Sequence, residues 1–228
     1  MPPMNTDPQM RALLEAILPH VAFDGWGPAA FAAAVAATGM SPDAARAMCP
    51  RGAVDLAVLF HRLGDADMIA AVQAADLSEM RFRDKVAFAL RARIAAIDDK
   101  EAVRRATSLF ALPHLAGEGA RLIWGTADAI WTVLGDTSTD INWYSKRATL
   151  SAVYASVILY WLGDSSADAV DTQAFIDRRI DDVMQVEKVK AQMRGNPLFK
   201  PLARLGSMVR APGALPRSDL PGYRGPRG

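Results

Sequence analysis

Three histidines, His20, His61 and His114, are the side chains of this chain best suited to acid–base or metal chemistry. They lie far apart in the sequence, and none belongs to a Glu-x-x-His or His-Glu-x-x-His pattern that would place two ligands on one helix face. The sequence also lacks a Gly-x-Gly-x-x-Gly motif after a strand, a P-loop and a Gly-x-Ser-x-Gly elbow. We therefore predict a protein that is not an enzyme and has no catalytic residue, metal or cofactor.

Aromatic side chains concentrate between residues 122 and 162, among apolar residues at helical spacing. Packing of helix against helix is the ordinary explanation for such a pattern. Indole and phenol rings can also line an apolar cavity, where their N–H and O–H groups contact the polar head of a lipid. The residues that we assign to a lipid-binding cavity are Trp124, Ile130, Trp131, Tyr154, Ile158 and Trp161.

A polar segment from Gly135 to Arg147 separates the two aromatic stretches. Gly135 can end one helix, and Thr139 or Asp140 can cap the next. Neither role accounts for Trp143, which precedes Arg147 by one helical turn on the same face. An aromatic ring beside a guanidinium is typical of protein-binding hot spots, but a cation–π pair at the end of an amphipathic helix explains it equally well.

Composition favours helices. Alanine and leucine are abundant, and no window alternates apolar and polar residues long enough to predict a sheet, so the fold class is all-α. The single cysteine, Cys49, excludes an intrachain disulfide and fits a reducing compartment. Because we find neither a signal sequence nor a run of 18 apolar residues, we expect a bacterial cytoplasmic protein, peripheral on the inner membrane.

Caps and breakers divide the chain into helices. Asp7-Pro8 can open a first helix, and Pro28 and Ser41-Pro42 can open two short ones, which gives residues 8–52 the look of a helix-turn-helix unit. A longer helix begins near Ala53 and starts a helical domain over residues 53–195. Further helices are predicted at about 82–97, 100–112, 114–134, 140–162 and 172–194.

Charge is uneven along the chain. From Glu187 onward there are nine Lys or Arg against two acids, a net charge of +7, whereas residues 1–186 are net −6. We predict an amphipathic membrane-binding helix at 196–211 and a disordered, Pro/Gly/Arg-rich tail at 212–228. Packing of that helix on the protein body is the alternative. The membrane-binding residues would be Leu198, Phe199, Leu202, Arg204, Leu205 and Val209.

Several segments between residues 122 and 183 together form a specific pattern: 127–131, 135–140, 142–147, Leu150, Tyr154, 164–166 and 175–180. This region resembles the coenzyme Q (ubiquinone) biosynthesis lipid-binding accessory family, whose fold is like that of TetR transcription regulators. A looser likeness continues from about residue 10. The resemblance implies a TetR-like helical bundle with a degenerate N-terminal helix-turn-helix, a lipid cavity, a homodimer and a C-terminal amphipathic helix.

The resemblance also implies a function: the protein presents a quinone precursor at an anionic membrane surface to a demethoxyubiquinone hydroxylase. A phospholipid is the other ligand we expect. The family's docking patch corresponds to Asp140, Trp143, Tyr144 and Arg147. The alternative is a TetR-like DNA-binding regulator that senses a lipid. Residues 10–52 carry as many acids as Lys and Arg, which disfavours phosphate binding, so we expect no nucleic acid partner.

Overall fold

The computed structural model describes residues 7–194, with side chains to residue 185. These residues contain no β-strand, which confirms the all-α prediction. The predicted membrane-binding helix at 196–211 and the tail at 212–228 lie outside the described residues. The helices are α1 (Pro8–Asp24), α2 (Pro28–Thr38), α3 (Pro42–Met48), α4 (Ala53–Ala74), α5 (Phe82–Ala95), α6 (Lys100–Phe110), α7 (Ala116–Val133), α8 (Ile141–Gly163), the short 3₁₀ turn η1 (Ala167–Ala169) and α9 (Val170–Arg194).

The short N-terminal helices begin and end at the residues that the sequence indicates. Asp7 accepts a hydrogen bond from the backbone N–H of Gln9 at 2.8 Å and caps α1. Ser41 caps α3 in the same way, and a proline follows each cap at the first helical position. Gly39 ends α2 in the left-handed conformation, with φ of 66°. Local chemistry therefore sets the boundaries of this unit.

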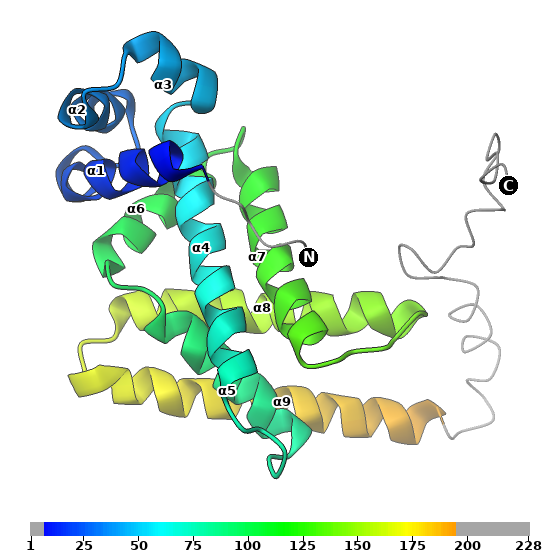
Figure 1. Ribbon diagram of the computed structural model, residues 1–228. Coiled ribbons are helices and arrows are strands. Elements are labelled where there is room, and N and C mark those ends of the chain that lie inside the picture. The colour runs from blue at the N-terminus through cyan, green and yellow to red at the C-terminus, as the bar shows by residue number, and fades with distance from the viewer. Residues whose placement is uncertain (1–6, 195–228) are drawn as a thin grey trace, which may run out of the picture.

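Apolar side chains form two hydrophobic clusters, and α4 belongs to both. The first cluster joins α1, α2 and α3 to the first half of α4 and to Ala102 of α6. The second joins the other half of α4 to α5, α7, α8 and α9. Figure 1 shows α4 running from the N-terminal helices down to the level of α9, with α8 passing behind its lower half. The candidate functional site described below lies where the two clusters meet along α4.

Trp26 connects the N-terminal unit to α6. The Trp26 side chain is 5% exposed, and its indole N–H donates a hydrogen bond to the carbonyl of Ala102 at 3.0 Å. We expect Trp26→Phe to lower the free energy of unfolding by about 1 to 2 kcal/mol, because the buried carbonyl loses its donor. Urea denaturation measures this change. Arg105→Met removes an exposed bond to the carbonyl of Ala22 and should cost less; an equal loss in both variants would contradict the argument.

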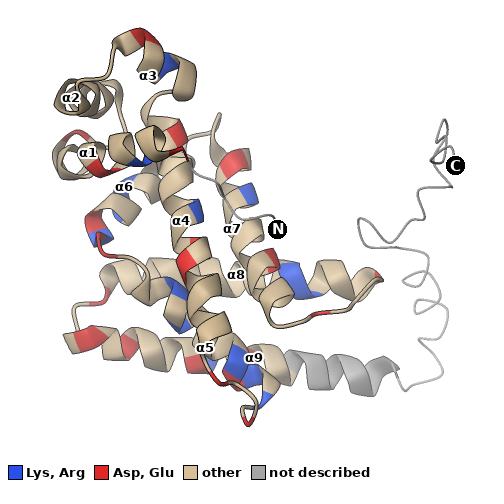
Figure 2. Ribbon diagram, viewed as in Figure 1, with Lys and Arg blue, Asp and Glu red and all other residues tan. Residues whose placement is uncertain are grey.

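The acidic face of α9 pairs with α5. Arg83 of α5 lies 2.5 Å from Asp181, and Arg91 lies 2.5 Å from Asp177. These carboxylates are about half exposed, so each pair adds no more than about 1 kcal/mol. The pairs nevertheless help to fix how α9 lies against α5 (Figure 2).

Candidate functional site

An apolar cavity of about 310 Å³ lies among α4, α5, α6, α7 and α8, where the two hydrophobic clusters meet. This volume is at the lower end of the range for small-molecule sites. Alanine side chains end at Cβ, so they leave space that larger residues would fill. The alanines that line the cavity are Ala96, Ala106, Ala111, Ala116, Ala120 and Ala155.

The cavity opens to solvent between the α6–α7 corner and α8. Leu159 of α8 lines the cavity and is 62% exposed. Ala111, Ala116 and Ala120 also line the cavity and are exposed. Residues that are both exposed and part of the lining mark where the cavity reaches the surface.

Polar side chains from four helices meet at the buried end of the cavity. His61 of α4, Arg93 of α5 and Tyr154 of α8 line it. Nε of Arg93 donates to Asp65 at 2.7 Å, and Nη2 of Arg93 donates to the backbone carbonyl of His61 at 3.0 Å. The hydroxyl of Thr126 on α7 donates to Asp65 at 2.9 Å and lies 2.9 Å from Nε2 of His61. We call these five residues the polar floor.

Burial decides the charge of the polar floor. It lowers the pKa of His61 to about 4, so the imidazole is neutral near pH 7. Burial also raises the pKa of Tyr154 to about 12, so the phenol keeps its proton. The guanidinium of Arg93 is 4% exposed and is balanced by the carboxylate of Asp65. The polar floor therefore carries no net charge.

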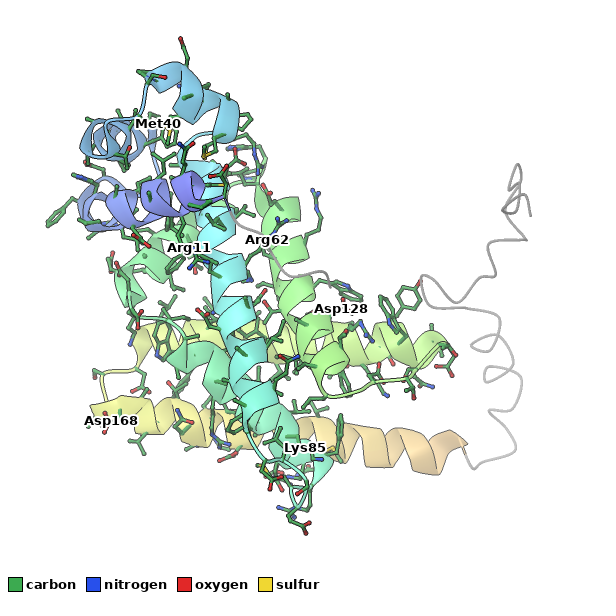
Figure 3. The ribbon with its side chains drawn as sticks, in the orientation of Figure 1. Arg11, Met40, Arg62, Lys85, Asp128 and Asp168 are labelled. Atoms are coloured by element: carbon green, nitrogen blue, oxygen red, sulfur yellow. The ribbon has the colours of Figure 1, made fainter. Side chains whose placement is uncertain are left out.

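Arg147 stands in a second polar cluster, at the start of α8. It is 2% exposed, and its Nη1 lies 3.0 Å from Asp136 in the segment before α8. Its Nε lies 2.5 Å from Asp128 of α7, which Figure 3 labels. Lys146 approaches Asp136 at 2.8 Å. The guanidinium also lies 4.0 Å from the centre of the Trp143 ring, so one side chain joins α7, the connecting segment and α8.

Asp140, Trp143 and Tyr144 lie in the first turns of α8 above this cluster. Asp140 caps the helix by accepting a hydrogen bond from the N–H of Asn142 at 2.9 Å. The ring of Trp143 lies edge-on to Tyr144, with centroids 4.8 Å apart, and packs near Trp124 at 6.0 Å. Their half-buried rings reach the surface, whereas Arg147 lies beneath them.

Comparison with known proteins shows which family these features resemble. Residues 116–187, which include α7, α8 and the segment between them, match the COQ9 family model. The chain is 31% identical over 187 residues to the probable ubiquinone biosynthesis protein coq9, mitochondrial, of Dictyostelium discoideum, which covers 78% of this chain and 60% of that protein. It is 37% identical over 112 residues to the human ubiquinone biosynthesis protein COQ9, mitochondrial. This match covers 49% of this chain and 34% of that protein.

The chain is similar to COQ9 proteins. It spans about 60% or less of the length of these curated COQ9 proteins. Its fold matches the crystal structure of a TetR transcriptional regulator from Nitrosomonas europaea, with a TM-score of 0.64 and 15% identity, over 77% of this chain and 97% of that one. This match confirms the predicted TetR-like fold and, at that identity, shows the fold alone.

The segment that matches COQ9 contains all six residues predicted to bind lipid, and two of them line the cavity. These are Tyr154, which belongs to the polar floor, and Ile158, which lies one turn further along α8. Ile130 is fully buried in the second hydrophobic cluster and does not line the cavity. A role for Ile130 in shaping the cavity would therefore be indirect.

The three tryptophans predicted to bind lipid also lie outside the cavity lining. Trp131 stacks on Phe82 with centroids 5.4 Å apart, and Trp161 is 7% exposed beneath the ammonium of Lys100. Trp124 packs near Trp143. Their observed contacts are those of helix packing, and the assignment of these residues to lipid binding stays a prediction.

Apart from Tyr154, sequence reasoning missed the polar floor. His61 and Asp65 stand four residues apart on α4, and Gly64 lies between them inside the helix. That spacing was the one local signal, since Arg93 and Thr126 come from distant parts of the chain. Within residues 7–194, no group of His, Cys, Asp and Glu could hold a metal ion, and no helix is long and apolar enough to cross a membrane.

Proposed function

We propose that this chain acts in ubiquinone biosynthesis as an accessory protein that performs no chemistry itself. It binds a quinone precursor in the apolar cavity and presents it to a demethoxyubiquinone hydroxylase, as a homodimer peripheral on the bacterial inner membrane. The observation that carries the proposal is the cavity, which is apolar along its walls and opens beside Leu159. The names of the COQ9 relatives supply the pathway.

The cavity would lower the cost of removing a poorly soluble molecule from a bilayer. Each methylene that stays buried is worth about 0.8 kcal/mol, so apolar walls replace the contacts that the lipid chain loses. A cavity of about 310 Å³ suits the head and the first part of an isoprenoid chain, with the remainder passing through the entrance. A phospholipid acyl chain could use the same walls.

Docking of the hydroxylase would use the aromatic surface at the start of α8. Trp143 and Tyr144 present adjoining rings there, next to the cap residue Asp140. Aromatic residues in such clusters dominate many protein interfaces. Arg147 would contribute from below, because its guanidinium packs against the Trp143 ring and holds it in place.

Filling the cavity should abolish lipid binding. Ala155 lines the cavity from α8, and Ala155→Phe would project a ring into it. After incubation with vesicles that contain ubiquinone, native mass spectrometry and organic extraction should recover at least tenfold less lipid from the variant than from the wild type. Ala152→Phe, at an exposed position one turn earlier, is the matched control and should bind normally. A wild-type protein that stays empty would contradict the proposed function.

A lipid-sensing DNA-binding regulator is the alternative, favoured by the TetR-like fold. The N-terminal unit offers little for DNA. Helix α3 has seven residues and carries Arg46 beside Asp43, while Arg51 is paired with Asp55 at 2.6 Å and with Glu118 at 2.5 Å. Figure 2 shows scattered, mixed charges on this unit. Sequence-specific gel shifts at low salt would favour the regulator, and we expect none.

A further inference from the structure

The polar floor provides hydrogen-bonding groups and charges that an apolar chain does not require. Alkyl and isoprenoid chains make no hydrogen bonds, and burying an ion pair beside them carries a desolvation cost that apolar residues of similar size would avoid. Arg93, at 4% exposed, and Asp65, at 14%, nevertheless stand at the end of the cavity with a neutral imidazole and a phenol. Such a group is suited to the polar end of a ligand.

Part of Arg93 is available to that ligand. Its Nε and Nη2 donate to Asp65 and to the carbonyl of His61, whereas Nη1 makes no hydrogen bond with the described residues. Nη1 also packs closely against Gly64. A Cβ atom at position 64 would lie only 2.5 Å from Nη1, which is too close. Gly64 thus lets the guanidinium lie against α4. Because Arg93 and Gly64 both line the cavity, the N–H groups of Nη1 are placed to bind a ligand oxygen.

The charge of the polar floor limits which ligand fits. Arg93 and Asp65 cancel, His61 is neutral, and Tyr154 keeps its proton. A carboxylate or phosphate would bring an uncompensated negative charge close to Asp65 in a buried place, which is unfavourable. A carbonyl or hydroxyl oxygen could accept a hydrogen bond from Nη1 and leave this balance unchanged.

From this geometry we infer that the polar floor recognises the neutral head group of an isoprenoid lipid, through a carbonyl or hydroxyl oxygen bound by Arg93, and disfavours anionic lipids. The inference rests on the proposed function, because it assumes that the cavity holds a lipid. It adds Arg93 and Gly64 as residues that determine which lipid is held. It also orients the ligand, with its head at the buried end and its chain toward Leu159.

Three probes test the inference on the full chain by isothermal titration calorimetry: a benzoquinone with a short isoprenoid tail, a fatty acid of similar length, and an isoprenoid hydrocarbon without a head group. The wild type should bind the quinone at least tenfold more tightly than the fatty acid or the hydrocarbon. The double variant Arg93→Met/Asp65→Asn removes both charges together, so no unpaired ion stays buried. It should lose at least tenfold in quinone affinity while binding the hydrocarbon unchanged.

Gly64→Ala is the second variant, since the added methyl group would displace Nη1 while every charge stays in place. It should also weaken quinone binding and leave hydrocarbon binding unchanged. Equal quinone affinity in the wild type and both variants would overturn the recognition role but leave lipid binding intact. A fatty acid that binds as tightly as the quinone would also overturn the recognition role and leave lipid binding intact. A wild type that binds none of the three probes would overturn the proposed function as well.

Discussion

Arg147→Ala should lower the free energy of unfolding by about 3 kcal/mol. Arg147 is 2% exposed, and the side chain of its partner Asp136 is also 2% exposed, so the variant leaves a buried carboxylate without one of its cations. Burial alone would raise the pKa of Asp136, but hydrogen bonds from Lys146, Ser138 and Arg147 hold it at about 2. Urea denaturation followed by circular dichroism at pH 7 measures the loss.

Two comparisons separate a buried ion pair from other causes. Asp128→Asn removes a partner of Arg147 that is 45% exposed, and should cost less than about 1 kcal/mol. The double variant Arg147→Met/Asp136→Asn should cost clearly less than the sum of the two single changes, because no lone charge remains. A loss below about 1 kcal/mol for Arg147→Ala would instead mean that this side chain is available to a partner, as the family resemblance suggested.

Helix boundaries were predictable because the interactions that set them are local. Asp7, Ser41 and Asp140 each cap a helix that begins at the next residue, and Gly39 and Gly135 each adopt positive φ after a helix. These caps act within a few residues of sequence, so a short window contains the whole cause.

Burial of Arg147 could not be predicted in the same way. Trp143 and Arg147 share a helix face, and from the sequence this pair suits either a docking surface or a packed helix end. The two acids that decide between them, Asp128 and Asp136, lie 19 and 11 residues earlier. Their approach depends on how α7 packs against α8, which periodicity does not specify.

Most of the residues that line the cavity were missed for a different reason. Hydrophobic patterns indicate which positions are filled, whereas a cavity results from small residues that face one another across helices. Ala106 of α6 and Ala155 of α8 line the same space, although each reads as an ordinary helix residue. The search for large aromatic residues therefore found packed side chains such as Trp131 and Trp161 as well as Tyr154 and Ile158, which do line the cavity.

His61 should make the fold sensitive to mild acid. Its pKa is about 4 in the folded protein, because burial disfavours the imidazolium, and about 6.5 when the chain is unfolded. Asp65, 3.6 Å away, favours protonation, whereas Arg93 and Arg62 oppose it. Above pH 6.5 both states hold a neutral imidazole. Between pH 6.5 and 4 the unfolded chain binds a proton that the folded protein does not, so stability falls by up to about 3 kcal/mol.

Urea denaturation at steps from pH 7.5 to 4.5 would show this loss, and His61→Gln is the control because glutamine keeps a polar side chain without titrating. In this variant, the free energy of unfolding should depend on pH only through the other titrating groups. Parallel curves for both proteins would mean that the folded protein protonates His61 at the same pH as the unfolded chain, so that the imidazole is charged below about pH 6.5. Such a charge would change the polar floor from neutral to positive, and would then favour the anionic lipids that a neutral floor disfavours. The pH dependence of unfolding and the proposed preference for a neutral head group therefore both depend on the charge of this buried imidazole.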